Sequence, residues 1–162
     1  AATRRLFDEK RLLAALDNYA AFGKPMHITE VTVPAFTEEA ADEQSQADVI
    51  ERLYRLWFSY PNVEQIVYWN LVDGYAYNAE PGDMSYGENY FRGGLLGFDM
   101  REKPAYQRLR HLIREEWTTD AEVTAGADGI ARFRGFYGDY EITAGKRKAA
   151  VRLYEDGKEA AV

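Results

Sequence analysis

Glu30 is the residue whose type and position are best suited to chemistry. It lies at the end of an apolar, β-branched segment, PMHITEVTVP, at residues 25–34. Burying an ionised carboxylate without compensation costs several kcal/mol. A carboxylate at the end of such a strand is therefore expected to be either a catalytic group or an ion-paired structural one. Glu30 is our candidate catalytic residue.

A second apolar segment, residues 63–72, carries Trp69, and Asp73 and Tyr77 follow it. Aromatic rings stack on flat, hydroxylated ligands, and a carboxylate between them accepts hydrogen bonds from hydroxyl groups. This spacing predicts a sugar-binding platform made by these three side chains. The structural alternative is that Trp69 fills a core and Asp73 caps a turn.

Strand alternation separates Glu30 from the nearby histidine. Successive side chains of a strand point to opposite faces. We therefore expect Glu30 to share a face with Met26 and Ile28, and His27 to point to the other face. His27 is interpreted as a structural residue.

The hydrophobic pattern predicts the element order helix, strand, helix, strand, helix, over residues 4–22, 26–33, 45–59, 63–72 and 104–117. Near-continuous apolar strands that alternate with amphipathic helices are typical of parallel strands covered by helices. The fold class is therefore α/β. The long Gly- and Tyr-rich loop at residues 74–98 follows the second strand, where such folds carry function.

The composition changes after residue 118. Turn signals at Asp128-Gly129, Gly138-Asp139, Gly145 and Asp156-Gly157 separate short alternating runs such as 131–133 and 140–143. The chain is therefore predicted to have two domains, residues 1–118 and a small antiparallel β-module at residues 119–162.

Composition excludes several classes of function. The net charge of −7 argues against nucleic acid as a partner, because phosphate backbones require a dense basic surface. The chain has no cysteine, so a thiolate metal site and a cysteine nucleophile are excluded. The longest apolar runs are too short to span a membrane. We expect no metal, no cofactor and no membrane insertion.

Three segments together, HITEVTV, VYWNLVDGYAY and GGLLGFDMREKPAYQRL, resemble the C-terminal part of glycoside hydrolase family 10, the endo-β-1,4-xylanases. The resemblance covers residues 4–117. It implies the seventh and eighth strands of a (β/α)8 TIM barrel, followed by a β-appendage like that of some xylanases of the family. It also implies a secreted, extracellular enzyme that hydrolyses xylan with retention.

The resemblance also implies roles for individual residues. Glu30 matches the family's nucleophile, and Trp69, Asp73 and Tyr77 match residues near its sugar subsites. Gln46 and the stretch 103–106 match further family positions.

Three departures from the family pattern concern the same region. Thr32 stands where the family usually has Asp, Asn70 replaces the usual Gly, and Tyr77 stands where Trp is commoner. They put the geometry of the sugar subsites in question more than the nucleophile.

The family's second carboxylate has no match in this chain. Retaining hydrolysis needs two carboxyl groups about 5–5.5 Å apart, and the Asn-Glu of the fourth strand belongs to the missing N-terminal part of the barrel. We therefore expect a fragment that is inactive by itself and needs that part for a complete active site. The alternatives are a non-catalytic carbohydrate-binding protein and a barrel glycosidase that acts on another β-1,4-glycan.

Overall fold

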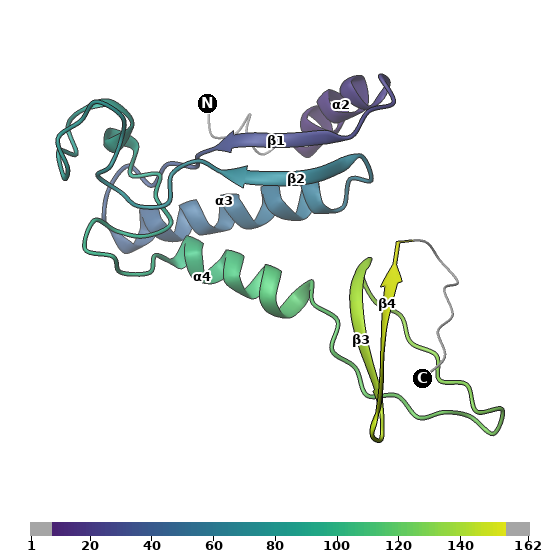
Figure 1. The fold of residues 1–162 in the computed structure, drawn as a ribbon. Helices are drawn as coiled ribbons and strands as arrows, with labels where there is room; N and C mark the ends of the chain where they lie inside the picture. Colours follow the sequence, from purple (N-terminus) through teal and green to yellow (C-terminus); the bar gives the residue numbers. More distant parts are fainter. Residues whose placement is uncertain (1–7, 155–162) are drawn as a thin grey trace. The chain divides into compact units, whose positions relative to one another are not determined.

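The computed structural model describes residues 8–154 (Figure 1). Its elements are α2 (Glu9–Ala20), β1 (Met26–Val31), α3 (Ala40–Phe58), β2 (Val63–Tyr68), the 3₁₀-helix η1 (Gly87–Phe91), α4 (Pro104–His111), the π-helix η2 (Leu112–Glu116), β3 (Gly138–Ala144) and β4 (Arg147–Leu153). The predicted order helix, strand, helix, strand, helix is confirmed. The chain divides into two compact units, residues 1–110 and 111–162. The predicted domain ranges, 1–118 and 119–162, stay predictions.

The first two helices differ in how well the sequence predicted their starts. The start expected for the first helix, residue 4, lies outside the described residues, and Gly23 ends that helix region with a φ of 63°. The prediction that the second helix begins at residue 45 is wrong, because α3 begins at Ala40. The acidic residues of its first turn, Asp42 and Glu43, interact favourably with the helix dipole. The polar stretch before residue 45 therefore forms the start of the helix.

β1 and β2 form a parallel pair, with Ile28 opposite Ile66 and Val31 opposite Tyr68. β2 ends at Tyr68, so the prediction that Trp69 lies within the strand is wrong. Beyond β2 the chain leaves β1 and pairs with a later segment instead, since Leu95 and Leu96 both donate to the carbonyl of Leu71. The two strands nevertheless end at the same edge, because the Trp69 amide donates to the Val31 carbonyl over 2.8 Å.

α3 covers one face of the strand pair (Figure 1). The buried apolar side chains of this unit include Val31, Val33, Ala47, Ile50, Leu53, Trp57, Leu95, Ala105 and Leu109. Within residues 8–110 no second layer covers the opposite face, and the sheet has only two strands. Two strands cannot close on themselves, so a complete barrel is not present. No helix in residues 8–154 is long and apolar enough to cross a membrane.

The second unit contains the predicted antiparallel hairpin, in which β3 pairs with β4. Residues 131–133, predicted as a strand, are irregular; Phe133 packs its ring 5.5 Å from that of Tyr140 instead. The predicted turn at Gly138-Asp139 is wrong, because both residues begin β3. The predicted turn at 156–157 lies outside the described residues.

Candidate active site

Glu30 lies in a β-bulge, where β1 slips against β2 between Ile28 and Val31. Its φ is 58°, and of the non-glycine residues with positive φ in residues 8–154 it is the one within a strand. Val31 takes the position opposite Tyr68, so it shares the face of Ile28. The predicted regular alternation, which placed Val31 on the opposite face from Ile28, is therefore wrong, and the face on which Glu30 lies stays a prediction. Bulges and left-handed residues often re-aim a side chain beside an active site, and Glu30 is exposed.

Trp69 lies next to the end of β1. Its amide donates to the carbonyl of Val31, the residue after Glu30, and its side chain is 55% exposed. The structure thus brings Glu30 and Trp69 to the carboxyl edge of the parallel pair, where α/β folds bind ligands. Tyr77 lies in the following loop and is 89% exposed. Both rings can therefore be reached by a ligand.

His27 lies on β1 before the bulge. Its Nε2 atom is 4.0 Å from a carboxylate oxygen of Glu64, which belongs to β2. Both side chains are exposed. The interpretation of His27 as a structural residue stays a prediction.

Asp73 is buried, in contrast to the other three predicted site residues. One oxygen of its carboxylate accepts a hydrogen bond from the Gly94 amide over 2.7 Å, and the other accepts one from Lys103 Nζ over 3.0 Å. Both oxygens are therefore engaged within the protein. In this structure Asp73 holds the loop together, and a direct contact with a sugar stays a prediction.

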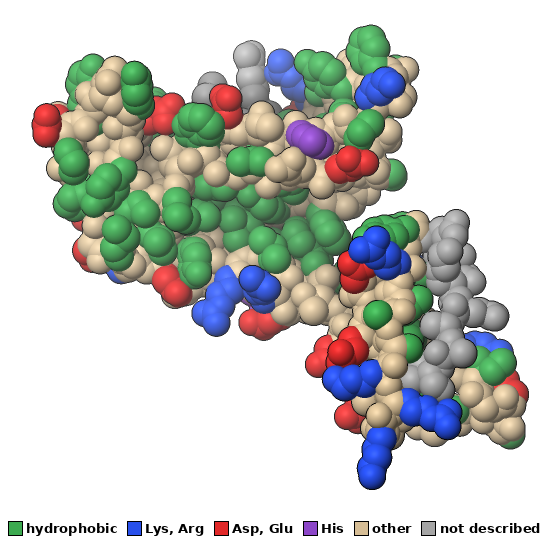
Figure 2. Space-filling model, in the orientation of Figure 1, with side chains coloured by type: hydrophobic (Ala, Val, Ile, Leu, Met, Phe, Trp, Pro, Cys, Tyr) green, Lys and Arg blue, Asp and Glu red, His purple; other side chains and the backbone are tan. Residues whose placement is uncertain are grey.

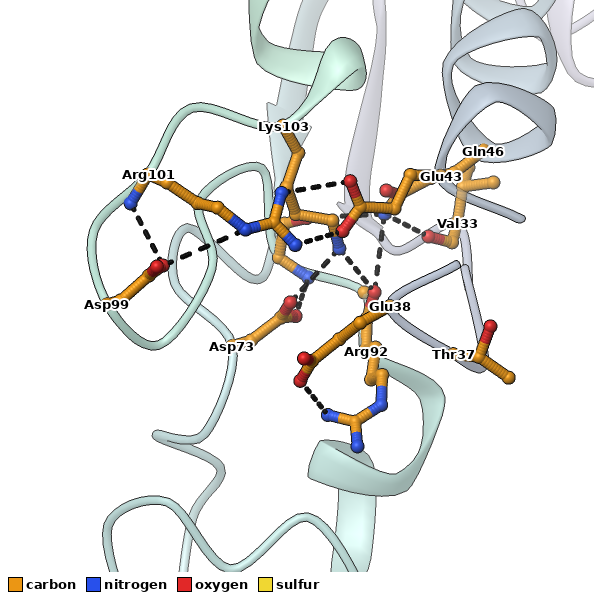
Figure 3. Close-up of polar contacts among 12 residues, drawn as sticks. Val33, Thr37, Glu38, Glu43, Gln46, Asp73, Arg92, Asp99, Arg101 and Lys103 are labelled. Carbon is orange, nitrogen blue, oxygen red and sulfur yellow. Dashed lines mark hydrogen bonds and ion pairs between the residues drawn. The ribbon is translucent and has the colours of Figure 1, made fainter. Parts of the chain in front are cut away.

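Lys103 is the partner that burial of Asp73 requires (Figure 3). Its side chain is 1% exposed, and its ammonium group also donates to the carbonyl of Arg92 over 2.8 Å. A buried ion pair is tolerated only when further hydrogen bonds satisfy both groups. Lys103 directly precedes Pro104, the first residue of α4, so these bonds join the start of that helix to both ends of the long loop.

Gln46 joins α3 to this network, and Glu43 joins α3 to Arg101, two residues before Lys103 (Figure 3). Gln46 Nε2 donates to the carbonyls of Val33 over 2.8 Å and Gly94 over 3.2 Å. Arg101 donates to both carboxylate oxygens of Glu43, over 2.9 Å and 2.5 Å, and this hydrogen bonding raises the pKa of the guanidinium group. Sequence motifs pointed to Gln46 and Lys103 only through resemblance, and gave no indication of these contacts.

The loop between β2 and α4 exposes many large apolar side chains (Figure 2). They are Trp69, Leu71, Tyr75, Tyr77, Tyr86, Tyr90, Phe91, Phe98 and Met100. The buried Asn89 shapes the loop, since its side chain accepts from the Ala76 amide and donates to the Asp83 carbonyl, both over 2.9 Å. An exposed carboxylate at a strand edge, flanked by a ring-rich loop, is an arrangement that can bind a flat, hydroxylated ligand and react with it.

Comparison with known families and curated proteins gives two matches. Residues 3–112 match the family Glycosyl hydrolase family 10. The anti-sigma-I factor RsgI6 of Acetivibrio thermocellus is 31% identical over 136 residues, which are 84% of this chain and 16% of that protein. The chain thus spans less than a fifth of the curated relative that it matches.

Solved structures support the fold. Xylanase 10B from Thermotoga petrophila RKU-1, in complex with xylobiose, matches with a TM-score of 0.56 and 20% identity. Native xylanase 10B from Thermotoga maritima gives the same values. Each alignment covers 68% of this chain and 33% of the xylanase. At this identity the likeness concerns the fold alone: the first unit is an α/β structure that resembles part of a family 10 barrel.

Removal of Lys103 should test the buried network. Lys103→Met leaves the Asp73 carboxylate buried without its cation, and Asp73→Asn leaves the ammonium group without its anion. Each single change should lower the free energy of unfolding by about 3–5 kcal/mol, as measured by urea denaturation. The exposed Lys24→Met is the matched control and should change it by less than about 0.5 kcal/mol. Unfolding of Lys103→Met at the wild-type urea concentration would contradict this role.

Proposed function

The chain belongs to glycosyl hydrolase family 10, and from this premise we propose that it forms part of a retaining endo-β-1,4-xylanase in which Glu30 is the nucleophile. The observation that carries the proposal is the backbone of Glu30. A glutamate with a φ of 58° in a strand is held in a disfavoured conformation, and such strain is concentrated at functional sites. The bulge leaves this carboxylate exposed at the strand edge beside Trp69.

In the proposed reaction, a carboxylate oxygen of Glu30 attacks the anomeric carbon and forms a glycosyl ester. A second carboxyl group protonates the departing glycosidic oxygen, then accepts a proton from the water that hydrolyses the ester. That second group is proposed to come from a part of the barrel outside this chain. The proposal agrees with the share of the xylanase 10B chains, 33%, that this chain matches.

Xylan or a xylo-oligosaccharide is the proposed substrate. The xylanase 10B structure that the first unit resembles contains xylobiose, and the exposed rings of Trp69 and Tyr77 suit stacking on pyranose rings. Asp73 would contribute indirectly, because its hydrogen bonds hold the loop that carries Tyr77. Xylan is a polysaccharide, and a polysaccharide is degraded outside the cell. We therefore also propose an extracellular location. Another β-1,4-glycan is the alternative substrate.

Glu30→Gln in the full-length protein should lower turnover of xylan by at least about 10³-fold, because the amide cannot form the ester. The rate of release of reducing sugar measures this. Glu64→Gln is the matched control: it is also an exposed strand glutamate, on β2, and should retain activity. The 162-residue chain alone should show no hydrolysis. Wild-type rates in the Glu30→Gln variant would overturn the assignment.

A non-catalytic, carbohydrate-binding role is the second candidate. It is favoured by the relative at 31% identity, which is an anti-sigma-I factor and by its name a regulator. The family match ends at residue 112. The match to the anti-sigma-I factor covers 136 residues of this chain, so it must continue beyond residue 112. In such a role the rings would bind the glycan, and Glu30 would accept a hydrogen bond.

The regulatory alternative predicts binding of xylo-oligosaccharides without turnover in the full-length protein. Trp69→Ala should then weaken binding by about tenfold, because a stacking ring is lost. Calorimetric titration with xylotriose measures the dissociation constant. Tyr19→Ala removes a similarly exposed ring from α2 and is the control. Hydrolysis that depends on Glu30 would exclude this alternative.

A further inference from the structure

Thr32 and Asn70, two positions at which the chain departs from the family pattern, are in direct contact. The Thr32 hydroxyl donates to the side-chain carbonyl oxygen of Asn70 over 2.5 Å. Thr32 lies two residues after Glu30, and Asn70 directly follows Trp69. The two departures therefore form one structural unit at the edge where the candidate nucleophile and the candidate stacking ring lie.

Two contacts fix the orientation of the Thr32 side chain, one made by its methyl group and one by its hydroxyl group. Its methyl group packs so closely on Gly93 that a side chain at position 93 would collide with it. Gly93 is itself held, because the Tyr68 hydroxyl donates to its carbonyl over 2.7 Å. Burial raises the pKa of Tyr68, so this hydroxyl stays protonated and can donate the hydrogen bond. The Thr32 hydroxyl is thereby directed at Asn70.

This contact orients the Asn70 amide toward Glu88. Since Oδ1 accepts from Thr32, Nδ2 is turned the other way and donates to Glu88 Oε2 over 3.3 Å. Glu88 belongs to η1, where its neighbour Asn89 is 4% exposed and anchored by two hydrogen bonds. The position of Glu88 is therefore set by the fold of the loop, although its carboxylate is exposed.

Two hydrogen-bonding positions of this cluster remain unused within residues 8–154. The Nδ2 atom of Asn70 has two protons and donates one to Glu88, and Glu88 Oε1 accepts no hydrogen bond. The cluster thus offers one donor beside one acceptor, on side chains that are already oriented. A donor and an acceptor side by side match two adjacent hydroxyl groups of a sugar, since each hydroxyl can both donate and accept.

We propose that Thr32, Asn70 and Glu88 form a subsite that binds two adjacent hydroxyl groups of a pyranose ring. Asn70 Nδ2 donates to one hydroxyl, Glu88 Oε1 accepts from the other, and Thr32 is a positioning residue that orients the amide. This proposal rests on the proposed function, because the glycan lies across Glu30 and Trp69. The subsite selects glycans by their hydroxyl pattern, at positions where the family pattern has other residues.

Titration of xylotriose into the full-length protein tests the subsite. Glu88→Ala and Asn70→Gly should each raise the dissociation constant by about tenfold, because a hydrogen bond to a sugar hydroxyl is lost. Glu88→Gln, which keeps the shape but removes the charge, should raise it less. Glu80→Ala removes another exposed carboxylate from the same loop and should leave it unchanged. Thermal unfolding confirms that each variant is folded.

Two further measurements separate a sugar contact from a structural role. The first uses a series of xylotriose analogues that each lack one hydroxyl group. One analogue should bind wild type about tenfold more weakly than xylotriose does. The same analogue and xylotriose should bind the Glu88→Ala variant equally well, because the partner of the missing hydroxyl is already absent there. Thr32→Val should weaken binding in the wild type but not in the Asn70→Gly background, since Thr32 acts through the amide. Equal sensitivity of wild type and Glu88→Ala to every analogue would overturn the proposal.

Failure of the subsite and failure of the proposed function give different results. If the subsite is wrong, wild type binds xylotriose and turnover still depends on Glu30, but Glu88→Ala and Asn70→Gly bind as wild type does. If only the proposed hydrolysis is wrong, wild type binds xylotriose without turnover that depends on Glu30, and the weaker binding of Glu88→Ala and Asn70→Gly still supports the subsite. If wild type neither binds nor hydrolyses any β-1,4-glycan of a panel of xylan, glucan and mannan, both proposals are overturned.

Discussion

The buried ion pair between Lys103 and Asp73 is the constraint on which the rest of the first unit depends. Two charges removed from water need every remaining hydrogen bond, and those bonds come from the Gly94 amide and the Arg92 carbonyl. The requirement brings Asp73 in the segment after β2, the exit of η1 and the start of α4 to one point. The long loop between them is consequently held at both ends, and the side chains that it exposes have a defined place.

Sequence patterns predicted the elements better than their ends. Hydrophobic periodicity gave the right order of helices and strands, because each buries one continuous apolar face. The bulge at Glu30 leaves a trace in the sequence, because the apolar residues Met26 and Ile28 before it and Val31 and Val33 after it are out of step by one position. The prediction of a regular alternation missed this shift. The start of α3 was missed because its first turn is polar, and charged residues there stabilise a helix through its dipole rather than through packing.

The predicted site residues also show what a sequence pattern can and cannot separate. Trp69 and Asp73 were grouped by their spacing, yet one is 55% exposed and the other 6%. Only the position of Lys103, thirty residues later in the chain, decides that Asp73 faces inward. Resemblance to a family flagged the lysine without its contacts. Likewise, Thr32 and Asn70 looked like two separate departures until their hydrogen bond joined them.

The positive φ of Glu30 has a consequence for the evolution of this position. Left-handed backbone favours glycine, and after it asparagine and aspartate, over every residue with a longer or branched side chain. Random substitution at residue 30 would therefore drift toward those small residues, with a gain in folding stability. A glutamate that persists across a lineage at such a position is retained against the preference of the backbone. Its persistence or loss among descendants would thus record whether selection acts on the carboxylate or only on the fold.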